Sequence, residues 1–198
     1  MEHLKPKHVA TLIIVAGIGL FTVLQVRTCI KDRRVANRAS ADREIHAYFT
    51  STVKPALSPP ATGEPAKLAR PILPVIPPHE VGLERVDTQL DVGVYKDLDP
   101  AQRTDHLAGA GSIVIVEREV AGFYAGSQAA GGAVATSAVV TVFDVQSRSV
   151  TGKLVVELSQ PPDPVATQQM VDDYRDLFSG MVVVHLQALP PAAGTSAR

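Results

Sequence analysis

The six histidines are the first side chains to consider, because imidazole ligates metals and titrates near neutral pH. No two of them combine with a further ligand at a metal-binding spacing. Only His106 and His185 lie within the part of the chain that we expect to fold as a globular domain, so only these two could share a site. The pattern favours isolated surface histidines over a metal centre. The full set is His3, His8, His46, His79, His106 and His185.

Two glycine-containing segments could hold phosphate, since backbone N–H groups in such loops cradle anions. Residues 109–111 (Gly-Ala-Gly) precede an expected strand instead of following one, and they lack a third glycine and a Lys-Ser/Thr pair. The segment 125–132, AGSQAAGG, lacks the same partners. Ser127, Ser137 and Thr141 stand outside any nucleophile-elbow sequence. We therefore predict neither a nucleotide site nor a catalytic nucleophile.

Carboxylates are the remaining candidates. Asp172 and Asp176 share one face of an expected C-terminal helix, where they could bind a divalent cation or face a basic partner. A solvated acidic face is the interpretation that we favour. Asp144 interrupts an apolar strand, and we expect it to accept hydrogen bonds in the following turn or to pair with Arg148 or Lys153. The sequence thus predicts no catalytic, metal-binding or cofactor-binding residues and no cofactor.

One long uncharged segment determines where any domain could act. Residues 9–26 are eighteen residues without a charged side chain, and fifteen of them are apolar or glycine. A helix of this length spans about 27 Å, slightly less than the roughly 30 Å hydrocarbon core of a bilayer. The flanking Lys7 and Arg27 can extend their charged ends to the two interfaces. We predict a transmembrane helix within residues 1–27, with the lipid bilayer contacted through residues 9–26.

A cleaved signal peptide is the competing interpretation of this segment. The apolar run is longer than the roughly 7–15 residues of a typical signal-peptide core, and no small-x-small cleavage site follows it. An uncleaved signal-anchor of a single-pass membrane protein fits better. The basic residues after the span place the C-terminal part in the cytoplasm by the positive-inside bias, whereas a short basic N-terminal tail favours export. We expect the cytoplasmic orientation and leave the alternative open.

Charge is distributed unevenly, although the formal net charge is only −1. Residues 1–54 contain nine Lys or Arg and four Asp or Glu, a net charge of +5. Residues 81–190 contain seven basic and fourteen acidic residues, a net charge of −7. An acidic domain repels the phosphates of nucleic acid, so we expect no nucleic-acid binding, whereas a protein partner with a basic surface is allowed. The single cysteine, Cys29, permits no intramolecular disulfide.

Composition divides the rest of the chain into further segments. Residues 28–52 contain no glycine or proline and are predicted to continue the membrane helix as a juxtamembrane stalk. Residues 53–80 contain eight prolines, which favour extended conformations, so we predict a polyproline-like linker. A plain spacer is favoured over a docking motif at its P-x-x-P sequence, residues 71–74. Residues 81–190 are the predicted soluble domain, and residues 191–198 a disordered tail.

The domain is predicted to be α+β, with a small, mostly antiparallel sheet of about four strands and two helices. Alternation of apolar and polar residues predicts a strand over 85–94. Runs of β-branched residues predict three more strands, over 112–124, 134–145 and 153–159.

Capping signals predict the two helices of the domain. Asp99 followed by proline resembles the start of a short helix that Gly109 would close. Asp163 resembles the cap of a longer C-terminal helix, which apolar residues at helical spacing support and Gly180 would end. Residues 181–189 fit a strand or a continued helix equally well.

These patterns favour a membrane-anchored binding or scaffolding module over an enzyme. The alternative is a membrane-tethered enzyme whose site is built from scattered carboxylates and a histidine, and a structural envelope component is a third possibility. A concave pocket that gathers at least three such groups would favour the enzyme, whereas a flat or convex acidic surface would favour the binding module. The sequence leaves the oligomeric state open.

Overall fold

The computed structural model describes most of the chain after residue 36. Its contacts divide the chain into two units, residues 1–40 and 41–198, and the elements of the fold belong to the second. The predicted transmembrane helix lies outside the described residues. Within them, no helix is long and apolar enough to cross a membrane. The described ranges are 37–57, 66–81, 84–123, 133–158 and 168–192.

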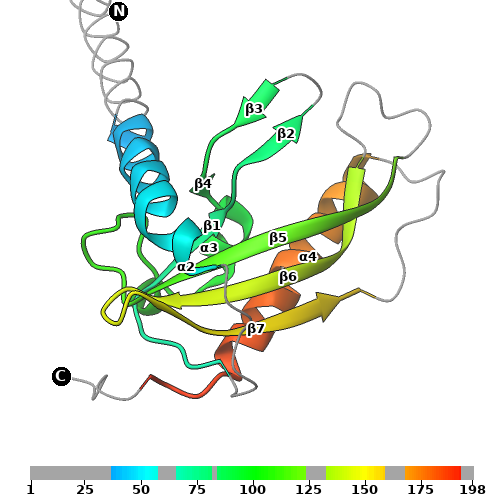
Figure 1. Ribbon diagram of the computed structural model, residues 1–198. Coiled ribbons are helices and arrows are strands. Elements are labelled where there is room, and N and C mark those ends of the chain that lie inside the picture. Colours follow the sequence, from blue (N-terminus) through cyan, green and yellow to red (C-terminus); the bar gives the residue numbers. More distant parts are fainter. Residues whose placement is uncertain (1–36, 58–65, 82–83, 124–132, 159–167, 193–198) are drawn as a thin grey trace, which may run out of the picture. The chain divides into compact units, whose positions relative to one another are not determined.

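A five-stranded mixed sheet with the order β4-β1-β5-β6-β7 forms the centre of the second unit (Figure 1). Strand β1 is parallel to β5, and all other neighbours are antiparallel. The fold is therefore α+β as predicted, with one more strand than expected and one parallel pair. The strands of the sheet are β1 (Ile72–Ile76), β4 (Gln89–Leu90), β5 (Ser112–Phe123), β6 (Ala133–Asp144) and β7 (Ser149–Glu157), and a separate hairpin contains β2 (His79–Val81) and β3 (Glu84–Val86).

Helix α4 (Gln168–Gln187) packs on one face of the sheet (Figure 1). Its buried side chains Phe178, Val182 and Leu186 are spaced four residues apart and so form one stripe. They contact every second residue of the central strands, as the pleat of a sheet requires. The short helix α3 (Val92–Asp97) packs beside α4. A Cβ atom at Gly93 would lie 2.5 Å from Ser179 Oγ, so glycine allows this close approach.

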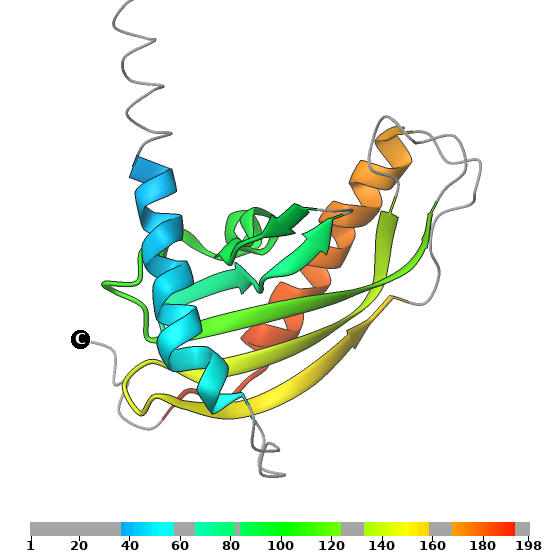
Figure 2. The same ribbon diagram turned by 45° about the horizontal axis from the view of Figure 1, so that its top comes forward.

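A helix before the sheet covers part of the opposite face. Residues 41–48 are α-helical and continue into a π-helical turn, η1 (Phe49–Val53), and then into α2 (Lys54–Ala56). Figure 2 shows this helix, coloured blue to cyan, crossing one end of the long strands. Its buried residues pack in a second core with residues of β1, β4, β5 and β6. That core contains Ile45, Phe49, Val53, Leu73, Val75, Leu90, Ile113, Ile115 and Phe143.

This packing corrects two predicted boundaries. The predicted stalk, 28–52, ends in residues that belong to the domain, because Ile45 and Phe49 are buried in its second core. The predicted linker, 53–80, contains α2 and β1 and is not a spacer in its described parts. Pro74 is tolerated in β1 because a proline lacks the backbone N–H donor but keeps its carbonyl acceptor. The carbonyl oxygen of Pro74 accepts from Asp91 N at 3.0 Å. The P-x-x-P sequence is largely buried in β1, which excludes its use as a docking motif.

Two short-range predictions between residues 85 and 109 are also wrong. The strand over 85–94 does not continue past Leu90, because Asp91 Oδ1 accepts from Val94 N at 3.2 Å and caps α3. Asp99 acts as a cap as predicted, with Oδ1 accepting from Ala101 N at 2.8 Å. It begins only the 3-10 turn η2 (Pro100–Gln102), not a helix that reaches Gly109.

The remaining elements follow the sequence more closely. The strands predicted over 112–124, 134–145 and 153–159 are confirmed as β5, β6 and β7, with small differences at their ends. Helix α4 continues through Gly180 to Gln187, so the predicted end is wrong and residues 181–187 are helical. The cap assigned to Asp163 lies outside the described residues.

The start of the predicted disordered tail is ordered in the structure. The carbonyl oxygen of Pro190 accepts from Leu68 N at 2.9 Å, and Ala192 N donates to Leu68 O at 3.1 Å. Two segments that are distant in the sequence therefore lie side by side. The predicted tail begins too early by at least two residues, and residues 193–198 lie outside the described ranges.

Candidate functional site

The face of the sheet opposite α4 is only partly covered by described residues. Near the helix at 41–56, Ile113, Ile115 and Phe143 are buried on this face. Farther along the same strands, side chains on the same face are exposed or half-buried. This surface is termed the open face here, and its members are Glu117, Glu119, Ser137, Val139, Lys153, Val155 and Glu157.

The strand register arranges the open face in rows across β5, β6 and β7. Residues opposite one another in neighbouring antiparallel strands have Cβ atoms roughly 5 Å apart. Each row is therefore a set of neighbouring side chains that one extended ligand could contact together. One row is Glu117, Val139 and Val155, and the next is Glu119, Ser137 and Glu157.

The open face has an apolar centre with acidic neighbours. Val139 is 36% exposed and Val155 is 58% exposed, although both are large apolar residues. Ser137 Oγ donates to Glu119 Oε2 at 3.0 Å, which holds that carboxylate on the surface. Lys153 is the one basic member, so the three glutamates give the face a net negative charge.

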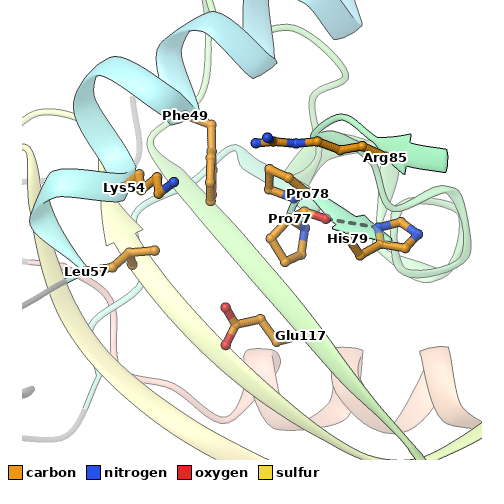
Figure 3. Close-up of a pocket in the computed structure, with 8 residues that line it drawn as sticks. All are labelled: Phe49, Lys54, Leu57, Pro77, Pro78, His79, Arg85 and Glu117. Atoms are coloured by element: carbon orange, nitrogen blue, oxygen red, sulfur yellow. Dashed lines mark hydrogen bonds between the residues drawn. The ribbon is translucent and has the colours of Figure 1, made fainter. Parts of the chain in front are cut away.

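A pocket of about 340 Å³ lies where the open face meets the end of the helix and the β2–β3 hairpin (Figure 3). Phe49, Leu57 and two prolines provide apolar walls, and three charged side chains line the rest. His79 Nδ1 donates to the carbonyl oxygen of Pro77 at 3.1 Å, within the segment that forms one wall. This pocket, termed the Phe49 pocket, is lined by Phe49, Lys54, Leu57, Pro77, Pro78, His79, Arg85 and Glu117.

A buried ion pair lies on the other face of the sheet. Arg118 of β5 points toward α4, and its Nη2 donates to Asp91 Oδ2 at 2.6 Å. The Asp91 side chain is 2% exposed and that of Arg118 is 26% exposed. The guanidinium carbon of Arg118 lies 5.9 Å from the centroid of the Phe178 ring. Buried charges need such partners, so we infer that this ion pair has a structural role and holds β5, α3 and α4 together.

Each of the four histidines in the described part of the chain has a partner of its own. His106 Nε2 lies 3.6 Å from Asp105 Oδ1, and His185 Nδ1 donates to the carbonyl oxygen of Met181 at 2.9 Å. His46, expected on a stalk, has its Nδ1 accepting from Thr88 N at 3.2 Å. That contact joins the helix to the segment between β3 and β4. In the part of the chain that the structure describes, no group of three or more His, Cys, Asp or Glu residues could hold a metal ion.

The acidic candidates have local roles. Asp144 is buried, and its Oδ1 accepts from Ser147 N at 2.6 Å, which confirms the predicted turn role. Asp176 is exposed on α4, whereas the side chain of Asp172 lies outside the described residues. Partial burial and the nearby charge of Asp176 raise the pKa of Asp97 above its ordinary value, and Lys96 opposes this rise.

Among the described residues, the glycine segment 109–111 and the hydroxyl residues Ser137 and Thr141 have packing or surface positions and form no catalytic arrangement. A Cβ at Gly111 would lie 2.8 Å from Arg70 O, so residues 109–111 include a packing glycine. Thr141 is 2% exposed, and Ser137 belongs to the open face. The segment 125–132 lies outside the described residues.

Sequence reasoning missed the open face and the Phe49 pocket. One signal was present, because residues 113, 115, 117 and 119 share a face of β5 and change from isoleucine to glutamate along it. No comparable signal connects the pocket residues, since Phe49, Lys54 and Arg85 come from three segments that were predicted to be separate. In comparisons with known proteins, the chain matches no family model, no curated protein and no solved structure.

Proposed function

We propose that this chain is a single-pass membrane protein whose acidic domain binds a protein partner through the open face. The partner is an extended segment that carries both apolar and basic side chains on the same side of its backbone. The observation that carries the proposal is the pairing of exposed Val139 and Val155 with Glu117, Glu119 and Glu157 on one surface.

The two kinds of residue contribute differently to such binding. Burying apolar surface contributes about 25 cal/mol per Å², so the two valines supply affinity. Exposed ion pairs contribute only about 0–1 kcal/mol each, but charge complementarity raises the association rate and selects the partner. We therefore expect a transient complex whose formation is sensitive to salt.

A designed peptide tests the chemistry of the open face. Fluorescence anisotropy would measure binding to the full chain in lipid nanodiscs of a labelled Lys-Val peptide, in which Lys and Val alternate at every second position and serine fills the positions between, so that both kinds of side chain share one side of the extended peptide. We expect this peptide to bind more weakly as salt rises, and we expect no binding of the matched Glu-Val peptide. Replacing Glu119 and Glu157 together by Gln should weaken binding at least fivefold, whereas Glu44→Gln on the helix should not. Equal binding of both peptides would contradict the proposal.

Site-specific photo-crosslinking locates the contact in cells. A photo-reactive amino acid at Val155 should yield a crosslinked protein partner, and the same residue at Leu177 on α4 should not. The product should be lost when Glu119 and Glu157 are replaced by Gln. Products of equal yield from both positions would show that the open face is not the docking surface.

The proposed anchor, residues 9–26, allows the domain little separation from the bilayer. Thirteen residues, 28–40, separate the predicted span from the second unit. They reach about 20 Å if the whole segment is helical, as its residues 37–40 are. An experiment that varies the length of the tether should therefore insert or delete residues within 28–40. Deletions within 53–80 would instead remove β1.

Protease treatment of intact cells or spheroplasts tests the proposed orientation. We expect the domain to be protected, since the basic residues after the span favour a cytoplasmic C-terminal part. Detergent-permeabilised cells are the control in which it should be digested. Digestion of the domain in intact cells would contradict the proposed orientation and show that the domain lies outside the cytoplasm.

A further inference from the structure

We infer that the Phe49 pocket binds a small zwitterion with an apolar side chain, of the α-amino-acid class. The inference goes beyond the proposed protein-docking role of the open face, because the occupant is a free small molecule, although the two sites share Glu117. The inference rests on three charged side chains and four apolar ones that line one pocket.

The charged side chains offer groups of both signs. Lys54, Arg85 and Glu117 are exposed, and none of them has an ion pair or side-chain hydrogen bond among the described residues. In Figure 3, Lys54 and Arg85 lie on opposite sides of the Phe49 ring, and Glu117 extends from β5 beyond Pro77, apart from both. A guanidinium presents a planar fork to a carboxylate, and a glutamate accepts hydrogen bonds from an ammonium group.

Only a ligand with both charges complements all three groups. A simple anion would be opposed by Glu117, and a simple cation would be opposed by Arg85 and Lys54. A zwitterion directs its carboxylate to the Arg85 guanidinium and its ammonium group to Glu117, while Lys54 adds to the positive charge around the carboxylate. The arrangement therefore selects against singly charged molecules of the same size.

The apolar walls select a hydrophobic side chain. Phe49 is 4% exposed, and Leu57, Pro77 and Pro78 are half-buried. The proline rings restrict the backbone of their wall, so little conformational freedom is lost when a ligand binds. The volume of about 340 Å³ is at the lower end of the roughly 300–1,000 Å³ typical of ligand pockets, which suits a single amino acid.

Ligand-observed NMR with leucine and three matched analogues tests the site in the full-length chain in nanodiscs. Broadening of the leucine methyl signals would give the dissociation constant. N-acetylleucine lacks the ammonium group and leucinamide lacks the carboxylate, and we expect each to bind about tenfold more weakly because one charged hydrogen bond is lost. Glycine should not bind measurably, since it has no apolar side chain. Equal binding of leucine and either leucine analogue would overturn the inference.

Variants assign the contacts and separate this site from the open face. Arg85→Gln and Glu117→Gln should each weaken leucine binding about tenfold, while their thermal unfolding stays unchanged. Lys96→Gln and Glu44→Gln remove a matching charge outside both the pocket and the open face, and they should leave leucine binding unchanged. An unaltered affinity in Arg85→Gln would overturn the inference, even if Lys-Val peptide binding to the open face is normal. Loss of peptide binding in the Glu119 and Glu157 double variant with normal leucine binding would support two separate sites.

Discussion

The two faces of the sheet are made by the same three long strands, yet a charged residue is paired on one face and unpaired among the described residues on the other. On the α4 face, the apolar residues Val114 and Val116 are followed by Arg118, which is half-buried and paired with the buried Asp91. On the other face, Ile113 and Ile115 are followed by Glu117, which has no partner among the described residues. The change from apolar to charged side chains occurs at neighbouring positions of β5 on both faces.

This difference separates stability from binding. A charge that is buried and paired holds elements together but is unavailable to a ligand, whereas an exposed charge beside apolar surface contributes little to folding. We therefore expect substitutions on the α4 face to reduce the stability of the domain and substitutions on the open face to reduce binding. Four predictions test this division.

The largest effect is expected for Phe178→Ala. Phe178 is 3% exposed in the core under α4, and truncation of a buried phenylalanine costs about 3–5 kcal/mol. Chemical denaturation of the full-length chain in detergent would measure the free energy of unfolding. Leu177→Ala is the matched control on the same helix, because Leu177 is 56% exposed and its loss should change this free energy by no more than about 0.5 kcal/mol.

Phe49→Ala makes the same truncation on the other face, and we expect a smaller loss of about 2 kcal/mol. The helix at 41–56 covers one end of the sheet, so it can separate locally without unfolding α4. Amide hydrogen exchange should accelerate in the helix and remain slow in α4. Ser51 is exposed on the same turn, and Ser51→Ala should change neither the unfolding free energy nor the exchange rates. A uniform acceleration in both helices would show that the two faces unfold together.

Asp91→Asn should destabilise the domain by about 2 kcal/mol, because Arg118 loses the charge that compensates its burial. The asparagine amide can still cap α3, so the loss reports mainly on the ion pair. Glu117→Gln is the matched change on the open face and should be almost neutral for unfolding. Similar losses for both variants would contradict the proposed division between the faces.

The smallest effect is expected for Asp97→Asn. The pKa of Asp97 is raised by partial burial and by Asp176, so the folded state binds this proton more tightly than the unfolded state. Its contribution is favourable at pH values below the unfolded pKa and is lost as the pH rises through the raised folded pKa. The charged form therefore destabilises the protein at neutral pH.

Removing this carboxylate should raise the unfolding free energy at pH 7 by less than about 0.5 kcal/mol, because the residue is exposed and screened. Denaturation at several pH values would show the gain shrinking to zero at pH values below the unfolded pKa. Asp99→Asn would serve as the comparison, since asparagine also caps. A gain that grows toward low pH would contradict the sign of the shift.

The elements with strong local signals were predictable. The strands β5, β6 and β7 follow from runs of β-branched residues, and the turn role of Asp144 follows from its place after an apolar strand. Predictions from composition were wrong in segments whose structure depends on tertiary contacts. The prolines of residues 71–78 look like a spacer, yet Ile72, Leu73 and Val75 are completely buried, because β1 finds a parallel partner about forty residues later in β5.

By itself, the sequence determined the α+β class, the three long strands and the acidic character of the domain, and it predicts the membrane anchor. These properties depend on neighbouring residues, through alternation, propensity and summed charge. Only the tertiary structure decided which helix packs on each face of the sheet and at which residues of the strands the packed part of each face ends. That outcome depends on distant segments coming together, as where Phe49 and Ile113 join one core or where Arg118 pairs with Asp91. The open face and the Phe49 pocket exist because the helix at 41–56 covers one end of a sheet whose strands continue past it.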